Sequence, residues 1–524
     1  MGNDISSSIT PPPLSLQDCT IDGELDLLRY SIYRKRIKKK VLQNSLLQQF
    51  VKRKKEDDPF SIASTPKKRK YNPKERTIKK RKLMIRNADG TLRPFEPTDT
   101  IWYKLYIEQP PTDKHMLTLF RQRFRLTYNS YVELLNDIKQ HNIFCQWVNC
   151  DMCGSQPSNI DLLLLGTLRY LGRAWTFDDV NEATAISREV VRSFFHKFIL
   201  YGSTILYDKH VRNPALTTDL NEFGHLFTAA GFSGCIGSTD ATHVGMLSCA
   251  NWATHNHLGH KLSVPSRTYN VTVSHCRQIL HSTVGHPATW NDKTIILYDN
   301  FVRGVRDGEI FSEHEFTLFE KDENNEIIEV KYKGIWFMVD NGYLSWSCTV
   351  PPFKDGVTYE YIRFSEWLES MRKDVECTFG IMKGRFSILR YGLRVHSIKK
   401  CDEIWLTCCA LHNRLLFIDG LHKNWEIGGK SYWENEDKVH KKRKSIFALQ
   451  RLYSNNTSEG THDNEEFNYC KNSNSFDKYV VDGKRIVRKM PLHRFQDRLV
   501  HHFDICFKMK KIVWPVRIKQ PSAI

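Results

Sequence analysis

The sequence predicts an α/β protein whose core is preceded by an all-helical segment and by a disordered, basic N-terminal arm. A dense run of Lys and Arg marks the arm, helical apolar spacing starts near Trp102, and β-branched strands followed by a long helix occur after Gly231. We expect four parts: the basic arm over residues 1–98, a helix-turn-helix-like segment over 99–225, the α/β core over 226–425, and a C-terminal region over 426–524 in which a polar loop precedes a terminal helix.

Composition excludes some classes of protein. The chain has 524 residues, a net charge of +18 and 40% hydrophobic residues, which is enough for a large core. Its longest purely apolar runs, such as residues 162–165, are far shorter than the ~20 residues that span a bilayer, so we exclude a membrane-spanning protein. No signal peptide is recognisable, so we expect an intracellular protein whose 14 cysteines are reduced and mostly buried.

The N-terminal arm carries nearly all of the net charge. Residues 34–86 contain 21 Lys and Arg against four acidic residues, in blocks separated by Pro, Ser and Asn. Such blocks favour nuclear import and contact with DNA phosphates, so we expect a nuclear location. The alternatives are a solvated tail and membrane attachment, because residues 1–6 fit the N-myristoylation pattern and a polybasic segment would reinforce one acyl chain.

The helical segment has the order helix, tight turn, helix. Apolar spacing predicts helices around residues 120–138 and 161–171. Thr176 is placed to cap the next helix, residues 183–186 interrupt it, and a further helix starts at Ser187.

The last of these helices has the pattern of a DNA-recognition helix. Its apolar stripe consists of Val190, Val191, Phe194, Phe195 and Phe198. The stripe leaves a polar side, which we predict to bind DNA, with Ser187, Arg188, Arg192 and Lys197. The alternative is a plain helical hairpin that packs on the core.

Two predicted strands of the core end in an acidic residue. We expect short strands at residues 235–240, 269–274, 279–284 and 336–340. The first and the last of them end at Asp240 and Asp340. These two strands therefore present carboxylates at their C-terminal ends.

A third carboxylate lies on a long amphipathic helix. The apolar stripe of this helix extends from Phe364 to Met382, and Glu376 lies beside the stripe, so it can face the strand ends. Three such carboxylates can hold a pair of Mg²⁺ or Mn²⁺ ions, because hard cations prefer oxygen ligands, and such a pair clamps the attacking and leaving oxygens of a phosphodiester. Asp240 and Asp340 are separated by 99 residues, and Asp340 and Glu376 by 35.

Each acid also has a structural interpretation. Asp340 could belong only to an Asp-Asn-Gly turn, Glu376 could pair with Arg372 one helical turn earlier, and Asp240 could cap a turn. Their order, spacing and flanking residues together favour a catalytic triad.

The segments around these acids resemble the PIF/Harbinger group of DDE transposases, in particular its plant-transposon-protein branch. The resemblance rests on residues 234–243 (GCIGSTDATH), 285–292 (GHPATWND), 339–343 (VDNGY), 374–386 (DVECTFGIMKGRF) and 410–413 (ALHN). It extends from about Trp102, through a box at residues 120–125, to a last helix at residues 492–503.

The resemblance implies an RNase H-like core in which Asp240, Asp340 and Glu376 form the metal-binding catalytic triad. It also implies double-stranded DNA as substrate, cleavage at transposon ends, joining into a short A/T-rich target and a Myb-like DNA-binding partner. His243 matches the family's Asp-x-x-His, and we predict that His243 and Asp292 lie beside the site. Because paired ends need two active sites, we expect a homodimer.

Two departures from the family pattern leave all three acids in place. Ala241 satisfies only loosely the small residue expected after the first Asp, and the histidines at positions 255, 257 and 260 stand where an Asn-rich or aromatic loop is expected. An acidic insert at residues 320–330 is predicted to be a loop or a hairpin.

Other candidate residues flank the triad. We predict that Lys383 and Arg385, at the end of the same helix, contact the DNA backbone, although a solvated basic helix end is the alternative. His412 and Asn413 are expected to pack the core. A zinc site is disfavoured because two further groups lack the paired spacing of structural zinc ligands: His255, His257 and His260, and Cys145, Cys150 and Cys153.

These observations favour a metal-dependent DNA endonuclease of the transposase type. The first rival is a domesticated, non-cleaving DNA-binding or adaptor protein on the same fold. The intact triad argues against it, because three repelling carboxylates have no structural benefit. A transcription factor that uses only the helix-turn-helix segment would leave the α/β core unexplained.

Overall fold

The computed structural model describes residues 84–87, 89–150, 156–211, 217–354, 358–421, 478–481, 484–487 and 492–515. The import-like clusters and the myristoylation motif lie almost entirely outside these residues. Ordered structure begins earlier than Trp102, because β1 (Met84–Arg86) and β2 (Leu92–Pro94) pair as an antiparallel hairpin. None of the described helices is both long enough and apolar enough to cross a membrane.

The predicted helical segment is present. Its elements are η2 (Pro97–Asp99), α2 (Ile101–Tyr103), η3 (Lys104–Glu108), α3 (Lys114–Phe124), α4 (Tyr128–Gln140), η4 (Asn142–Trp147), α5 (Ile160–Arg173), α6 (Phe177–Thr184), α7 (Arg188–Tyr201), η5 (Gly202–Leu206), α8 (Tyr207–His210) and α9 (Thr217–Ala229). Thr176 and Asp179 form a reciprocal capping box that starts α6, and Ala185 ends it in a left-handed conformation with φ 56°. The helix–turn–helix order over α6 and α7 is therefore confirmed.

The core contains the sheet order of an RNase H-like fold. Its strands are β3 (Cys235–Gly245), β4 (Ser266–Val273), β5 (Ile279–Ser282), β6 (His286–Pro287), β9 (Trp336–Met338) and β10 (Thr349–Val350). The order across the sheet is β10-β9-β3-β4-β5, and β6 pairs with β4. β3, β4 and β5 are antiparallel, whereas β9 and β10 lie parallel to β3 on its other side.

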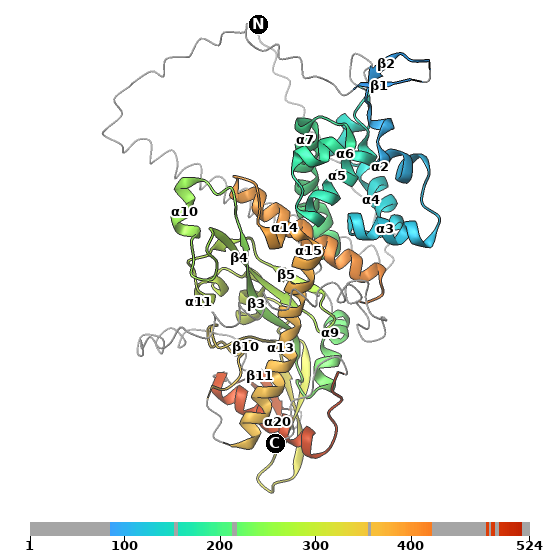
Figure 1. Cartoon of the computed structure of the whole chain (residues 1–524). Coiled ribbons are helices and arrows are strands. Elements are labelled where there is room, and N and C mark those ends of the chain that lie inside the picture. The colour runs from blue at the N-terminus through green and yellow to red at the C-terminus, as the bar shows by residue number, and fades with distance from the viewer. Residues whose placement is uncertain are drawn as a thin grey trace, which may run out of the picture. The chain divides into compact units, whose positions relative to one another are not determined.

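Helices cover both faces of this sheet (Figure 1). The helices of the core are α10 (Asn251–His257), α11 (Asp292–Ile296), α12 (Asn300–Arg306), α13 (Tyr359–Arg385), α14 (Ser387–Tyr391) and α15 (Ile398–Ile418). On one face Val271 and Val273 of β4 share a buried cluster with Val375 of α13. On the other face Ile236 of β3 packs with Val302 of α12.

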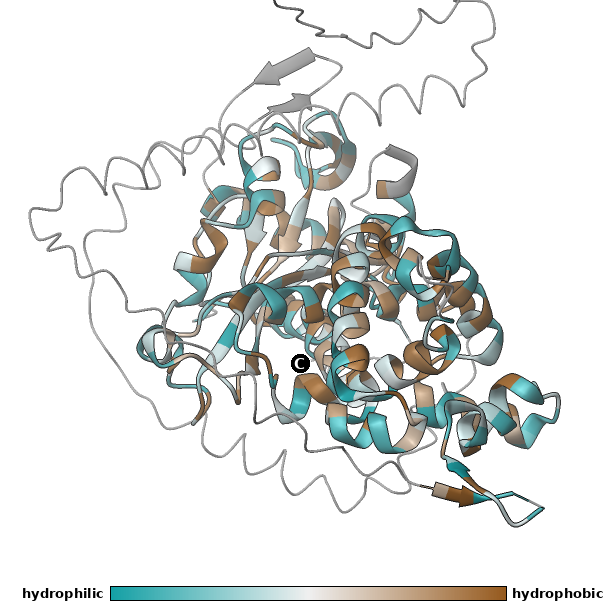
Figure 2. Ribbon diagram, turned by 90° about the horizontal axis from the view of Figure 1, so that it is seen from above, coloured by the Kyte–Doolittle hydropathy of each residue, from teal (hydrophilic) through white to brown (hydrophobic). Residues whose placement is uncertain are grey.

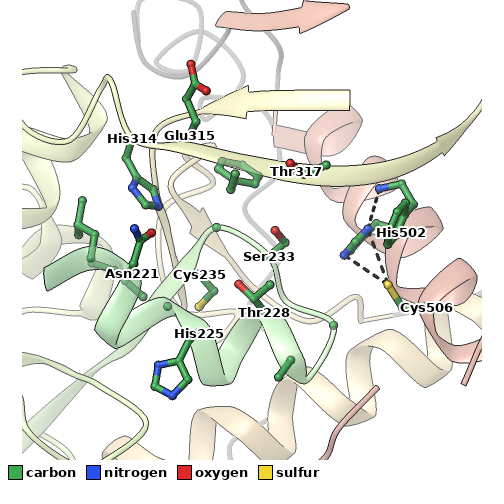
Figure 3. Close-up of a pocket in the computed structure, with 18 of the residues that line it drawn as sticks. Asn221, His225, Thr228, Ser233, Cys235, His314, Glu315, Thr317, His502 and Cys506 are labelled. Atoms are coloured by element: carbon green, nitrogen blue, oxygen red, sulfur yellow. Dashed lines mark hydrogen bonds between the residues drawn. The ribbon is translucent and has the colours of Figure 1, made fainter. Parts of the chain in front are cut away.

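A second sheet follows the core strands. Its order is β12-β11-β8-β7, from β7 (Glu315–Lys321), β8 (Ile327–Lys333), β11 (Lys478–Val481) and β12 (Lys484–Val487). The acidic insert thus forms the turn and flanks of a hairpin, one of its two predicted forms. The predicted last helix is α20 (Leu492–Lys508). Between α9, β7 and α20 lies a cavity of about 630 Å³, near the start of β3 (Figure 3).

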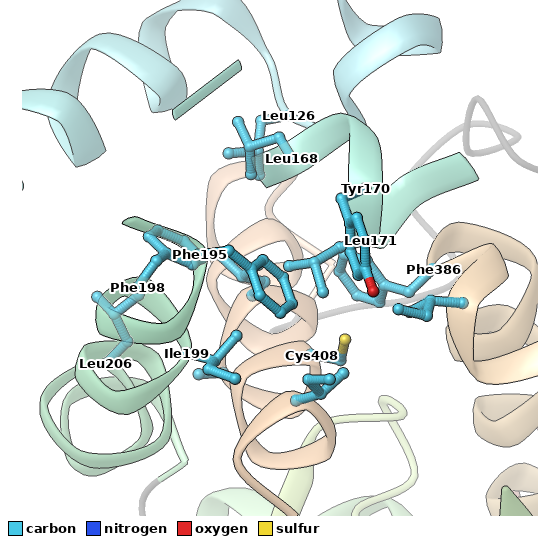
Figure 4. Packing of buried hydrophobic residues seen from close by; sticks show 14 of the residues in the cluster. Leu126, Leu168, Tyr170, Leu171, Phe195, Phe198, Ile199, Leu206, Phe386 and Cys408 are labelled. Atoms are coloured by element: carbon cyan, nitrogen blue, oxygen red, sulfur yellow. The ribbon is translucent and has the colours of Figure 1, made fainter. Parts of the chain in front are cut away.

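The helical segment and the α/β core share one hydrophobic cluster. Phe195 and Ile199 of α7 pack with Cys408 of α15 in its interior (Figure 4). Thr407 Oγ1 donates a hydrogen bond to Ile199 O, and a Cβ added at Gly202 would lie 2.4 Å from the Thr407 methyl group. Hydrophobic and hydrophilic stretches alternate along the helices of the molecule (Figure 2). The helix-turn-helix-like segment is therefore packed on the core.

The cysteines largely follow the expectation. No disulfide bond joins cysteines within the described parts of the chain, and Cys235, Cys276, Cys348, Cys401, Cys408 and Cys409 are buried. Cys145, Cys150 and Cys377 are exposed, which departs from the expectation that most cysteines are buried.

Candidate active site

The parallel pairing of β3 with β9 brings Asp240 and Asp340 together. Ser238 of β3 is in register with Met338 of β9, and this is the last residue pair between the two strands. Each aspartate follows two residues after that pair. Because the strands run in the same direction, both carboxylates leave the shared edge at the same level.

Asp240 lies inside its strand, so the prediction that the first strand ends at this acid was wrong. β3 continues to Gly245, because its pairing with β4 extends without interruption from Ser238 to Gly245. On the β9 side the pairing stops before Asp240. The backbone of Asp240 is therefore held by its pairing with β4, whereas β9 does not pair with it on the other side.

Arg372 links Glu376 of α13 to Asp240 of β3. Arg372 Nη2 lies 2.9 Å from Glu376 Oε1, one helical turn away on α13, and Arg372 Nη1 lies 3.2 Å from Asp240 Oδ2. The i, i+4 ion pair considered from the sequence is thus present. Since the same guanidinium contacts Asp240, it also holds the first and the third acid close to each other.

Asp340 forms the expected turn and lies next to Asp292. Asp340 Oδ1 accepts a hydrogen bond of 2.8 Å from Gly342 N. A Cβ added at Gly342 would lie 3.0 Å from Asp340 Oδ1 and 3.1 Å from Asp292 Oδ2, so both carboxylates border this glycine. Asp292 therefore lies beside Asp340, and Lys261 Nζ lies 4.0 Å from Asp292 Oδ2.

The acids influence one another's protonation. Burial raises the pKa of Asp240 to about 7; Arg372 opposes this shift, whereas the charges of Asp340 and Asp292 add to it. Burial also raises the pKa of Asp292, against the effect of Lys261. Desolvation is therefore the main cause of the raised pKa of Asp240, and the nearby Arg372 offsets it only in part.

Carboxylate side chains suit a hard divalent cation, but the three acids do not surround a common point in this structure. No group of three or more His, Cys, Asp or Glu side chains in the described residues is arranged to hold a metal ion. Between Asp240 and Glu376 this position is taken by the Arg372 guanidinium. Carboxylate oxygens are the ligands that Mg²⁺ and Mn²⁺ prefer, so the chemistry of these side chains fits such an ion.

Tyr343 is a buried residue near the acids of the site. It is buried, and burial together with four nearby aspartates, including Asp240 and Asp340, holds its pKa well above 10. Its hydroxyl donates a hydrogen bond of 2.7 Å to Asn270 Oδ1, and Asn270 Nδ2 donates one of 2.7 Å to Asp299. This chain of buried bonds fixes the segment that follows Asp340.

His243 lies on the opposite face of β3 from Asp240, because side chains three positions apart on a strand point to different faces. Its Nδ1 is hydrogen-bonded to Thr268 Oγ1 at 3.0 Å, and its buried Nε2 has no hydrogen-bond partner in the described residues. Burial lowers the pKa of His243 to about 4, and the positive charges of Lys261 and Lys383 add to this shift. The imidazole is therefore neutral at physiological pH.

Of the two residues of α13 that were predicted to contact the DNA backbone, only Lys383 remains a candidate. Lys383 is half-buried, and burial lowers its pKa to about 8. Arg385 is 1% exposed and its Nη1 lies 3.2 Å from His412 Nδ1, so it cannot reach DNA and its assignment is corrected. His412 and Asn413 are fully buried and bond the backbone of neighbouring segments, as expected of packing residues.

The predicted recognition face of α7 is exposed. The exposed residues include all four predicted contacts, Ser187, Arg188, Arg192 and Lys197. Ser187 precedes the helix as its N-cap residue, without a side-chain capping bond. Arg188 and Arg192 line a depression of about 550 Å³ together with Arg394 and Lys400. Acidic neighbours pair with them, since Arg188 lies 3.6 Å from Asp178.

The histidine group does not form a zinc site. His257 is buried and bonds Ser266 O through Nδ1 at 3.1 Å, whereas His255 and His260 are exposed. Of the cysteine group, Cys145 and Cys150 are exposed and Cys153 lies outside the described residues.

Sequence reasoning missed the double contact of Arg372 and the position of Lys261. A basic residue four positions before Glu376 signals only a local ion pair. Its second contact, with Asp240, joins residues 132 positions apart and has no local signature. Lys261 follows the α10 loop, and nothing in its neighbours indicated that it reaches Asp292.

The match to known families covers this site. Residues 239–413, a third of the chain, match the family model of the DDE superfamily endonucleases. The matched segment contains Asp240, Asp340 and Glu376, and its superfamily implies a nuclease or transposase acting on DNA. No curated protein and no solved structure matches the chain.

Proposed function

We propose that the protein is a metal-dependent DNA endonuclease of the transposase type, with Asp240, Asp340 and Glu376 as its catalytic acids. The main support is the register of β3 and β9, which brings two aspartates of the matched superfamily segment to one edge of the strand pair. Glu376 is linked to Asp240 through the guanidinium group of Arg372. The finer likeness to PIF/Harbinger transposases comes from the sequence motifs.

The three carboxylates would hold one or two divalent cations. When bound, such ions lower the pKa of an attacking water and stabilise the leaving 3′ oxygen of a phosphodiester. Asp240 must be ionised to act as a ligand, and its pKa of about 7 makes this readily reversible near neutral pH. Arg372 must move aside from Asp240 and Glu376, and in its displaced position it can pair with a DNA phosphate. The freed 3′-OH would then attack a phosphodiester of target DNA, so that a new ester bond forms, the target P–O bond breaks and the target's own 3′-OH leaves.

Positive groups around the carboxylates would position the DNA backbone. The candidates are Lys261, which lies 4.0 Å from Asp292, and the half-buried Lys383 of α13. Arg188 and Arg192 of α7 form only surface ion pairs, which are worth little and which a phosphate can replace.

The N-terminal arm, a nuclear location, a homodimer and a Myb-like partner complete the proposal. Each follows from the sequence: the arm from its charge, the dimer from the need to cut two ends, and the partner from the family resemblance. Light scattering with and without end DNA tests the dimer, and a monomer in both cases would contradict it.

A non-cleaving DNA-binding or adaptor protein is the second candidate. The observation that favours it is the Arg372 guanidinium, which pairs with both Asp240 and Glu376 without a metal ion. Incubation of supercoiled plasmid with the protein and Mn²⁺ or Mg²⁺ separates the two candidates. An endonuclease produces relaxed and linear DNA that EDTA suppresses, and an added oligonucleotide with a 3′-OH end is joined to the plasmid only if the enzyme is a transposase. Salt-sensitive binding with intact plasmid would favour the adaptor.

A further inference from the structure

A buried ion pair that the proposed chemistry does not use lies on the same helix as Glu376. His275 Nδ1 is 2.7 Å from Asp374 Oδ2, and both side chains are 3% exposed. An ionised carboxylate only accepts hydrogen bonds, so His275 donates through Nδ1. Arg277 Nε lies 3.7 Å from the other carboxylate oxygen of Asp374. A buried carboxylate needs such partners, and both of them belong to the turn between β4 and β5.

The turn between β4 and β5, residues 274–278, is itself held in one conformation. Arg277 N donates a hydrogen bond of 3.0 Å to Ser274 O. Arg277 has a φ of 61°, a left-handed conformation that is uncommon for residues other than glycine. His412 Nε2 of α15 donates a hydrogen bond of 3.0 Å to Arg277 O. Asp374 is therefore paired with a fixed part of the fold.

A second contact joins the end of α13 to the same turn. Arg385 is 1% exposed, and its Nη1 lies 3.2 Å from His412 Nδ1, while the other ring nitrogen of His412 binds Arg277 O. Asp374 precedes Arg385 by three helical turns, about 16 Å along the axis. The helix is thus attached to the β4–β5 turn directly at Asp374, and through His412 at its C-terminal end.

Asp374 and Glu376 lie on opposite borders of the buried stripe of α13. Side chains two positions apart on a helix point in directions that differ by about 200°. The buried Val375, between them, packs against the sheet. Arg372 is one turn before Glu376 and shares its side of the helix, where it contacts Asp240. One border of α13 is therefore attached to the β4–β5 turn and the other to β3.

The ion pair gives α13 a directional attachment that its apolar stripe lacks. Hydrophobic packing is non-directional, whereas a hydrogen bond requires its donor and acceptor to be aligned. We propose that His275 and Asp374 are a positioning pair for the candidate active site, which sets the rotation of α13 and thereby places Arg372 and Glu376 opposite Asp240. This inference rests on the proposed function, because it takes Glu376 as a metal ligand.

The first test removes both partners together. The double variant Asp374→Leu with His275→Phe replaces the pair by apolar side chains, a change that buried ion pairs often tolerate. Titration calorimetry with Mn²⁺ is carried out on the full-length protein. We expect about tenfold weaker binding than in the wild type, because a displaced Glu376 is a poorer ligand. Asp374→Asn keeps an oxygen that accepts from His275, so its affinity should stay within about threefold of the wild type.

The matched control is Asp504→Leu, which removes an ion pair elsewhere on the same helix. Asp504 is 9% exposed and lies 3.2 Å from Arg363, more than three helical turns before Glu376. This variant should lose stability but bind Mn²⁺ as the wild type does.

A thermodynamic cycle with Glu376→Gln separates positioning from general destabilisation. In the Glu376→Gln background, the additional loss of the His275–Asp374 pair should cost no further Mn²⁺ affinity, because the ligand that the pair positions is already absent. Equal losses of affinity with and without Glu376 would overturn the inference, and so would a double variant that binds Mn²⁺ as tightly as the wild type.

A crystal structure of the double variant tests the inference without metal or DNA. We expect an intact fold in which Arg372 Nη1 has moved from 3.2 Å to more than about 4 Å from Asp240 Oδ2, beyond the range of an ion pair. An unchanged distance would overturn the inference, whatever the protein does to DNA. A wild-type protein that neither binds Mn²⁺ nor nicks plasmid, with the expected movement in the double variant, would contradict the proposed function alone.

Discussion

Arg372 Nη1 lies 3.2 Å from Asp240 Oδ2, and its second nitrogen contacts Glu376. The arginine is only 13% exposed, so this contact is shielded from solvent. A positive charge therefore stands where two of the proposed ligands would meet a metal ion. The first prediction follows from this competition.

Replacement of Arg372 by Met should strengthen metal binding. The carboxylates lose their internal counter-charge, while a side chain of similar length keeps the packing of α13, so we expect Mn²⁺ to bind about tenfold more tightly at pH 8. Titration calorimetry measures the affinity. Arg372→Lys keeps the charge and should resemble the wild type. Weaker Mn²⁺ binding by Arg372→Met would show that the arginine supports the metal site.

Asp240→Asn should stabilise the metal-free protein, and the gain should depend on pH. Burial raises the pKa of Asp240 to about 7, whereas in the unfolded chain it is about 3.9. Between these values the unfolded state loses its proton first, so the folded protein loses stability as the pH rises through this window. Asn does not titrate, so the gain in the free energy of unfolding of Asp240→Asn over the wild type should grow from pH 5 to pH 8. At pH 8 this gain is on the order of 2–4 kcal/mol. Urea unfolding in EDTA measures this, and an identical difference at both pH values would contradict the prediction.

Glu376→Gln should separate chemistry from binding. The amide is a poor metal ligand but keeps the shape of a side chain that is 47% exposed, so we expect cleavage to fall by more than about 100-fold. DNA affinity, measured by fluorescence anisotropy, should change by less than about twofold, because Glu376 does not donate to phosphates. Equal losses of cleavage and binding would mean that Glu376 has a structural role.

Asn413→Ala should destabilise the fold. Asn413 Oδ1 accepts a bond of 2.9 Å from Ile279 N, and its Nδ2 donates to Ile279 O and His210 O. The substitution leaves buried backbone groups unpaired, so we expect a loss of about 2–4 kcal/mol in the free energy of unfolding, measured with urea. The exposed Asn324→Ala serves as control and should change it by less than about 0.5 kcal/mol. A loss for Asn413→Ala no larger than that of the control would refute the assignment.

Much of the architecture could be predicted, because it depends on local periodicity. The i, i+3, i+7 spacing of Val191, Phe194 and Phe198 defines the buried stripe of α7, and the structure buries all three. The acids at positions 240, 340 and 376 were recognisable from their spacing and flanking residues, because both can be read directly from the linear sequence. Arg385 was mispredicted although it lies three positions after the buried Met382, so its burial was compatible with the stripe.

Long-range pairing and exposure could not be predicted in the same way. β3 continues past Asp240 because of its pairing with β4, which the residues near Asp240 do not encode. The contact of Arg372 with Asp240 depends on how α13 crosses the sheet. Sequence composition also favours a buried tryptophan, whereas Trp252 is exposed because its short helix is anchored on the opposite side.

Plasmid nicking by matched variants tests the central claim most directly. Wild type, Asp240→Ala and Glu323→Ala are compared on supercoiled DNA with Mn²⁺ and with EDTA, and Glu323, an exposed acid at the tip of the β7–β8 hairpin, serves as control. We expect metal-dependent nicking by the wild type and Glu323→Ala, and none by Asp240→Ala. Nicking that persists in Asp240→Ala, or that is absent from all three proteins while they bind DNA, would contradict the assignment of these carboxylates to DNA cleavage.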